Sequence, residues 1–295
     1  MDFLSSILEQ GLIYGIMALG VYITYKILDF PDLTVDGSFP MGAAITAVMI
    51  NGGVPAAVTL PAAFLAGGVV GMLTGMIHVK LHVRDLLSGI IMMTALYTVN
   101  LRIAGKANLP FYNKPTIFDN PAVNAIFPAA LADFRTVIIL FVITAAVKLL
   151  LDWYMGTKSG FLLRAVGNND TLVTSLGVDK GRVRIIGLTI ANALVSLGGC
   201  LFAQQQRYFD VTMGTGTMVI GLASVIIGTS LFRKISFFRV TTSVILGSVI
   251  YKACVAIAIR LGLAASDMKL VTAVLFLIIL VISMDKKRKV ASQDA

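Results

Sequence analysis

Two Asp-x-Thr pairs are the polar groups of this sequence best placed to handle a small charged solute. Asp32 and Thr34 follow one long apolar run, and Asp210 and Thr212 follow another. Carboxylates can meet a substrate amine and hydroxyls can hydrogen-bond it, although the same side chains are also common helix N-caps. The candidate residues of a solute path are Asp32, Thr34, Asp36, Ser38, Asp210, Thr212 and Thr215.

The stretches that hold these pairs resemble each other. Residues 32–45 and 210–223 both begin with Asp, an aliphatic residue and Thr, pass through Gly, Ser or Thr, and become a short apolar segment. In the order of the apolar runs, the first short segment would run outward and the second inward, as in the inverted repeats of transporters. Broken backbone at membrane depth is tolerated where it lines a watery path, so 31–42 and 210–221 are expected to line one. A chance likeness of two N-caps is the alternative.

Other reactive groups give no support for an enzyme. His78 and His82 are four residues apart, but no further metal ligand is near them in the sequence. The sequence has a single glutamate, Glu9, and no Gly-x-x-x-x-Gly-Lys-Ser/Thr loop. We therefore expect no catalytic, metal or cofactor site in this chain. Lys252 lies inside an apolar run, where pairing with Asp36 or Asp210 and snorkelling are both open.

The elements that must position these residues are membrane spans. The 295 residues are 57% hydrophobic and 13% charged, against about 25% charged in soluble proteins. The sequence predicts an all-α, polytopic transmembrane bundle that forms one domain over residues 1–295. About nine spanning segments, including short or broken helices, are expected at 3–28, 39–50, 54–78, 86–103, 136–151, 184–206, 212–231, 240–260 and 269–284.

Charge predicts how the bundle sits in the membrane. The net charge of +9 comes from basic residues between apolar runs, and not from one patch. This pattern favours contact with membrane lipid and not with nucleic acid. The basic tail 285–295 is expected in the cytoplasm, and nine crossings then place the N-terminus outside. The sequence thus predicts a multi-pass inner-membrane protein, in which the outer loop 104–135 either caps the bundle or docks a partner.

The loop 157–184 between two predicted spans is basic and amphipathic. Asn169 or Asp170 would cap a short helix that runs to about Leu176, and Gly177 suits the end of such a helix. This helix would lie across the cytoplasmic face, where a partner could reach it.

This loop resembles the coupling loop of the permeases in the branched-chain amino acid and ribose class of ABC importers. The residues that carry the resemblance, or that fall in the helix it implies, are Gly160, Arg164, Gly167, Asn168, Asn169, Leu176 and Gly177. Residues 11–20 also look like that family's first span, and the resemblance covers about residues 10–285. It implies two permease subunits on two cytoplasmic ATPase subunits, which hold ATP and Mg, and an extracytoplasmic substrate-binding protein. Arg164 would anchor the loop to lipid phosphate or to the ATPase, or would be a plain positive-inside charge.

One departure from the family bears on the cargo. Branched-chain amino acid members carry an Asn-Phe-Ala-His-Gly-like stretch after the first span, whereas this chain has Asp29-Phe30-Pro31-Asp32-Leu33-Thr34-Val35-Asp36-Gly37. The chain therefore looks like a less characterised branch, for which aromatic amino acids are a suggested cargo. The sequence predicts a homodimeric importer permease for a small solute, an amino acid being favoured. An ion-coupled secondary transporter with inverted repeats is the alternative, and a membrane enzyme is disfavoured.

Overall fold

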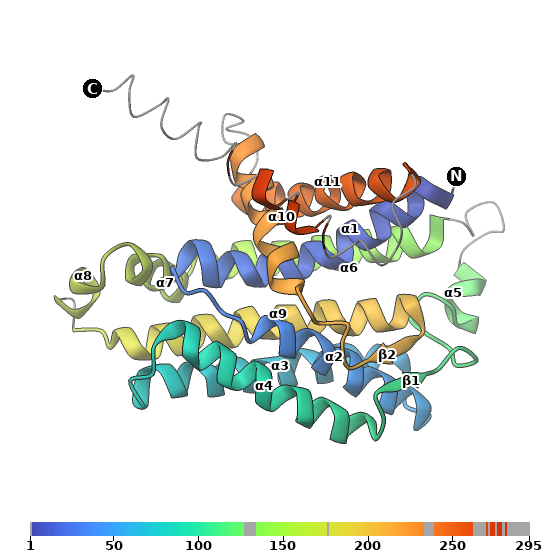
Figure 1. Cartoon of the computed structure of the whole chain (residues 1–295), viewed down its shortest axis with the longest axis horizontal. Coiled ribbons are helices and arrows are strands. Elements are labelled where there is room, and N and C mark those ends of the chain that lie inside the picture. The colour runs from blue at the N-terminus through green and yellow to red at the C-terminus, as the bar shows by residue number, and fades with distance from the viewer. Residues whose placement is uncertain are drawn as a thin grey trace.

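A computed structural model of the chain describes residues 2–126, 134–175, 177–232 and 239–261, and then 270, 272–274, 276–278 and 281. Within these residues the protein is a bundle of helices with one small pair of strands (Figure 1). The predicted all-α, polytopic architecture is confirmed.

Six helical stretches of the described chain are long and apolar enough to cross a membrane. They are α1 (Asp2–Val21) with the π-helix η1 (Tyr22–Ile27), η2 (Ala56–Val58) with α3 (Thr59–Lys80), α4 (Asp85–Ala104), α6 (Arg135–Met155), α9 (Lys180–Gln206) and α11 (Val240–Arg260). Two shorter helices, α2 (Val35–Asn51) and α10 (Thr217–Leu231), match the two short apolar segments of the expected repeat. Half of the predicted segment 269–284 and all of the tail 285–295 lie outside the described residues, so the number of spans stays a prediction.

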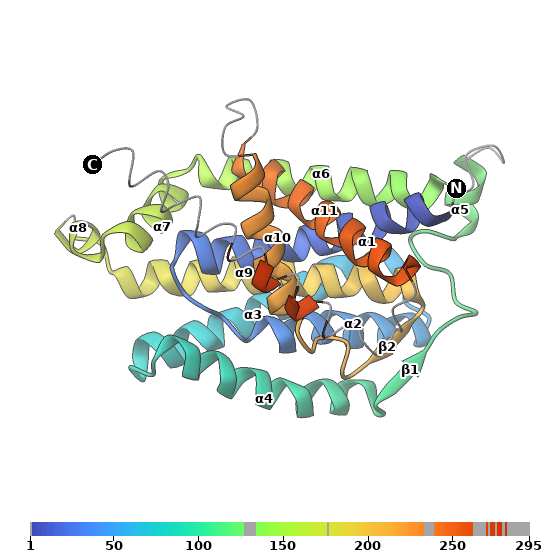
Figure 2. The same ribbon diagram turned by 45° about the horizontal axis from the view of Figure 1, so that its top comes forward.

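The long helices lie side by side, and their connections gather at two opposite ends (Figures 1 and 2). One end, here called the strand end, holds α5 (Pro121–Ile126), β1 (Asn108–Pro110) and β2 (Tyr208–Asp210). The other, here called the loop end, holds α7 (Lys158–Asn168) and α8 (Asp170–Ser175). Antiparallel pairing of β1 with β2 sets Asn108 opposite Asp210 and so joins the loop after α4 to the end of α9.

Helix α9 forms the centre of the bundle, where it packs against α1, α2 and α3. Glycines allow the backbones to approach closely, as is common between membrane helices. A Cβ atom at Gly71 of α3 would lie 2.1 Å from the carbonyl oxygen of Leu188, and one at Gly42 of α2 would lie 1.9 Å from that of Ser196. These contacts bring the polar residues in the middle of α9 against α2 and α3.

The two short helices begin inside the bundle and differ in direction. Helix α2 ends beside β1, where Asn51 Nδ2 donates a hydrogen bond to the Pro110 carbonyl over 3.4 Å, so it runs toward the strand end. Helix α10 runs crosswise to the long helices in both views (Figures 1 and 2). It begins at Thr217 and not at 212, because residues 211–216 form turns. The inverted repeat therefore remains a prediction.

Candidate functional site

A fully buried polar network surrounds the start of α2. Asp32 Oδ1 accepts a hydrogen bond from the backbone N–H of Thr34 over 2.9 Å, and Asp32 Oδ2 accepts one from Asn192 Nδ2 over 2.7 Å. The Ser38 hydroxyl donates to Asn192 Oδ1 over 2.6 Å, and the hydroxyls of Thr34 and Thr74 lie 3.1 Å apart. All five side chains are inaccessible to solvent. The network thus ties the turn before α2 to α3 and α9.

The carboxylate of Asp36 joins the starts of the two short helices. Asp36 lies in the first turn of α2, and its oxygens accept hydrogen bonds from Gly216 N at 2.9 Å, Met218 N at 2.8 Å and the Thr217 hydroxyl at 3.0 Å. These groups form the N-terminus of α10, whose N–H groups have no partner inside the helix. The Asp36 side chain therefore caps the N-terminus of a helix that lies far along the chain and whose own N-cap residue is Gly216.

A cavity of about 250 Å³, here called the inner pocket, lies beside this cap. It is bounded by α2, α4 and the turns at 211–216. Its polar side chains come from Asp36, Thr94, Tyr97, Asn100 and Thr215, and Gly37, Pro40, Met93 and Val211 complete the lining. Asn100 Nδ2 donates to the Gly37 carbonyl over 3.0 Å, which fixes α4 against the start of α2.

A second cavity of about 390 Å³, here called the outer pocket, lies at the strand end. It is lined by Asn108, Tyr112, Tyr208, Asp210, Thr212 and Met213. Partial burial disfavours the charge of Asp210, but hydrogen bonds from the Thr212 hydroxyl and backbone and from Asn108 outweigh it and hold the pKa of Asp210 below its ordinary value. Asp210 is therefore ionised at neutral pH and gives the outer pocket a negatively charged side chain.

The structure divides the predicted path residues into three groups. Asp36 and Thr215 line the inner pocket, and Asp210 and Thr212 line the outer pocket. Asp32, Thr34 and Ser38 belong to the buried network. Whether any of them touches solute stays a prediction. The idea that Asp210 and Thr212 cap α10 is wrong, because six residues of turn separate Asp210 from α10 and Asp36 supplies the cap.

Two residues important to this region escaped the sequence reasoning. Asn192 is a single amide in the long apolar stretch of α9, and polar residues at membrane depth are usually functional or structural anchors. That signal was available. Tyr97 gave no such signal, because its place beside Asp36 depends on how α4 packs. Among the contacts of the described residues, Lys252 is seen over the Tyr14 ring, with Nζ 3.5 Å from the centroid, and not beside Asp36 or Asp210.

Helix α7 packs firmly against the end of η1. Thr157 caps α7 by accepting a hydrogen bond from Gly160 N over 3.4 Å. The Leu163 and Val166 side chains of α7 are buried. A Cβ atom at Gly167 would lie 1.6 Å from the Ile27 carbonyl oxygen, so only glycine permits this approach. Arg164 donates from Nη2 to the Met155 carbonyl over 2.7 Å and lies over the Phe161 ring.

The short helix predicted within 157–184 is confirmed as α8. Asn169 is extended and exposed, α8 covers Asp170–Ser175, and Gly177 has a φ of 72°, which suits glycine after a helix. Leu176 lies outside the described residues. Asn168 ends α7 on the exposed surface. The preceding helix α7 was not predicted as a separate element.

Comparison with known proteins places this arrangement in context. Residues 3–284 match the family described as "Branched-chain amino acid transport system / permease component". The chain is 43% identical over 272 residues, 92% of its length and 88% of the relative's, to the tyrosine transport system permease protein of Clostridioides difficile. It is 25% identical over 76% of its length and 68% of the relative's to the ribose import permease protein RbsC of Escherichia coli K12. No solved structure matches the chain.

Proposed function

Because the chain belongs to the permease-component family of the branched-chain amino acid transport systems, we propose that it is the membrane subunit of an ATP-driven importer of tyrosine or a related aromatic amino acid. The family makes it a non-enzymatic, multi-pass transport subunit. The observation that carries the cargo is the 43% identity, over 92% of this chain, to a permease named for tyrosine transport. The expected aromatic amino acid branch agrees with this relative.

The two ends of the bundle suggest the partners. Lys158, Arg164, Lys180 and Arg182 lie in or beside α7, α8 and the start of α9, and such charge favours the cytoplasm. A cytoplasmic ATPase, which would hold ATP and Mg, would seat the α7–α8 hairpin. The substrate-binding protein would dock at the strand end, where the outer pocket opens. The C-terminal tail would then be cytoplasmic.

The path in this proposal runs from the outer pocket to the inner pocket along residues 210–215. Asp210 would receive the substrate ammonium first, and Tyr112 and Tyr208 offer rings to an aromatic side chain. Asp36 and Thr215 would meet the substrate next, beside Tyr97. The buried network around Asn192 would hold the wall of this path and not touch the solute.

The contact of α7 with η1 gives a route for the energy. Gly167 lies against Ile27, and Asp32 follows five positions later, so a shift of α7 displaces the turn that leads to Asp36. Closure of the ATPases would move α7, and thereby α2 and the cap of α10. This movement would couple ATP hydrolysis by the partner to α2 and α10, without an ATP site in the permease.

The test begins with capture of the tagged chain from its own membranes in mild detergent, followed by an ATPase assay on the eluate. We expect an ATPase to copurify. Replacement of residues 169–176 by a Gly-Ser linker of equal length should abolish its capture, while alanines at Asn113 and Lys114 at the strand end should not. The captured complex, placed in vesicles with its binding protein, should take up labelled tyrosine only when ATP is present.

The same experiment tests the alternative. A chain that purifies alone and takes up tyrosine without ATP, driven by an imposed ion gradient, would be a secondary transporter. The proposal would then be abandoned. Uptake of leucine or ribose in place of aromatic amino acids would keep the importer but reject its cargo.

A further inference from the structure

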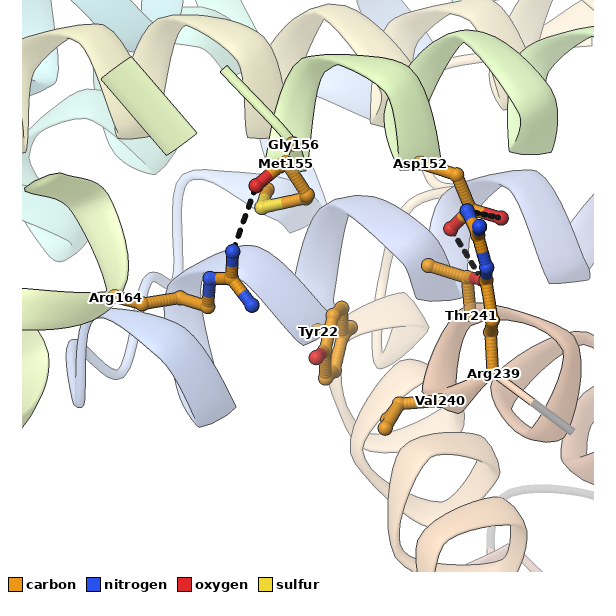
Figure 3. Close-up of a pocket in the computed structure, with 8 residues that line it drawn as sticks. All are labelled: Tyr22, Asp152, Met155, Gly156, Arg164, Arg239, Val240 and Thr241. Carbon is orange, nitrogen blue, oxygen red and sulfur yellow. Dashed lines mark hydrogen bonds and ion pairs between the residues drawn. The ribbon is translucent and has the colours of Figure 1, made fainter. Parts of the chain in front are cut away.

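A third cavity, of about 440 Å³, lies at the loop end, away from both solute pockets. Four elements enclose it: η1, the end of α6, α7 and the start of α11. Its lining residues are Tyr22, Asp152, Met155, Gly156, Arg164, Arg239, Val240 and Thr241. Figure 3 shows Arg164 and Arg239 entering from opposite sides, with the Tyr22 ring between them.

The charge of this cavity is positive in spite of Asp152. The buried carboxylate of Asp152 is already paired, with Lys148 Nζ at 2.8 Å, the Thr241 hydroxyl at 2.7 Å and Arg239 Nη1 at 3.4 Å. The lining thus holds the two positive charges of Arg164 and Arg239 against the one carboxylate of Asp152, which Lys148 also neutralises. An anion in the cavity would balance this excess.

Donors for such an anion are available. A guanidinium group has five N–H donors, and the bonds seen here direct Arg164 Nη2 to the Met155 carbonyl and Arg239 Nη1 to Asp152. The remaining N–H groups suit phosphate oxygens. Helix α11 begins at Val240 without a side-chain cap hydrogen bond, and its N-terminus adds a favourable partial positive charge.

The surroundings favour a lipid over a soluble phosphate. Met155, Val240 and the Tyr22 ring give the cavity an apolar part. The neighbouring face of α6 exposes Leu149, Leu150 and Trp153 by 61%, 66% and 71%, as expected of a surface against acyl chains with Trp at the membrane interface. Basic pockets between helices at one membrane face are typical sites for anionic headgroups.

We propose that this cavity binds the phosphate of an anionic lipid headgroup between Arg164 and Arg239. The bound phosphate would bridge α7 to α11, which both also pack against α6. This proposal concerns lipid binding by the permease alone and stands apart from the cargo and the ATPase.

Native mass spectrometry of the purified full chain in detergent tests it. The chain is titrated with dioleoyl phosphatidylglycerol and, separately, with dioleoyl phosphatidylcholine. We expect retention of phosphatidylglycerol at concentrations where phosphatidylcholine is lost. Arg239→Gln should weaken that retention about tenfold, the usual effect of losing one hydrogen bond to a charged group. Arg164→Lys keeps the charge and should weaken it less.

Arg182→Gln is the matched control, because it removes the same charge from the same end of the bundle. Arg182 is paired with Asp179 at 3.5 Å and its side chain is 84% exposed, outside the cavity. Equal losses for Arg182→Gln and Arg239→Gln would reduce the effect to general charge and overturn the site. Unchanged retention in Arg239→Gln would do the same.

Two further outcomes are decisive. Release of phosphatidylglycerol by an equal concentration of inorganic phosphate would show that the cavity takes soluble phosphate, which overturns the lipid assignment. If the Arg239→Gln variant no longer captures the ATPase but still retains phosphatidylglycerol, the cavity serves partner docking and the lipid proposal is overturned. Folding of each variant is checked by its gel-filtration profile and by its melting temperature.

Discussion

At the scale of single residues, Asp36 joins two helices that are about 180 positions apart in the chain. It belongs to α2 and caps α10 through three hydrogen bonds. The same carboxylate lines the inner pocket. Its two roles, as a structural cap and as a partner for solute, can be separated by comparing substitutions.

Asp36→Ala should destabilise the protein by about 2 kcal/mol, the upper range for loss of an N-cap, and lower its melting temperature by roughly 5 °C. Asp36→Asn keeps a carbonyl acceptor and should melt closer to the natural protein. Thermal unfolding in detergent measures the role of Asp36 as a cap, and tyrosine uptake measures its role in transport. A loss of uptake in Asp36→Asn at unchanged melting temperature would show that the charge itself serves transport. Unchanged melting of Asp36→Ala would disprove the cap.

Asn192 is the bridge of the buried network, since it donates to Asp32 and accepts from Ser38. Asn192→Leu keeps the branched shape of the side chain but is larger, and it removes the hydrogen bonds to Asp32 Oδ2 and to the Ser38 hydroxyl, which stay buried, at a cost of roughly 3 kcal/mol. We expect a large fall in melting temperature. Asn51→Leu, at an exposed hydrogen bond of 3.4 Å, is the control and should change little. Similar falls for both variants would contradict the importance of the network.

At the scale of helices, α3 and α9 make the most extensive contact among the described elements, and adjacent glycines of α3 face it differently. A Cβ atom at Gly67 would lie 2.4 Å from the Asn192 carbonyl oxygen, whereas one at Gly68 would have Thr189 Cγ2 as its nearest neighbour at 3.6 Å. One position thus excludes a methyl group and the next accepts it.

Gly67→Ala should therefore separate α3 from α9 and destabilise the protein by about 1–3 kcal/mol, as overpacking does. Gly68→Ala should be neutral or slightly stabilising, because alanine has the higher helix propensity. Melting temperatures of the two variants check this. If both melt alike, the close approach does not limit stability.

The helices were predictable from sequence to the extent that a local signal defined them. Long apolar runs predicted the spans, and Gly177 predicted the end of α8. Helix α7 was not predicted although Thr157 precedes it as a cap, because Gly160 and Gly167 lower its helix propensity. Capping of α10 by Asp210 and Thr212 was one of the alternatives, and the true cap was beyond prediction, since only packing brings Asp36 to Gly216. The direction of α10 was equally beyond reach, because turns at 211–216 set it and no periodic pattern encodes them.

At the scale of the whole molecule, the proposed importer needs a second membrane subunit. A pair of ATPase subunits would offer two docking sites, one for the α7–α8 segment of each permease subunit. Nothing in the sequence requires a second kind of permease. We therefore expect the captured complex to contain two copies of the 31.4 kDa chain and two ATPase subunits. Mass photometry of the detergent-solubilised complex, with and without cross-linking, measures this. A complex with one copy of the chain, or with a different permease beside it, would contradict the homodimer.

The two-stranded ribbon of β1 and β2 has a mechanical consequence. Backbone hydrogen bonds hold Asn108 to Asp210 in register, and Arg207, the last residue before β2, grips the same loop through the Tyr112 carbonyl and Asp119 at 2.8 Å and 2.6 Å. This loop is therefore tied to the turns at 211–216 that precede α10. In the proposed importer, a substrate-binding protein that docks on the loop would displace these turns, so its arrival would act on α10 before any solute is released.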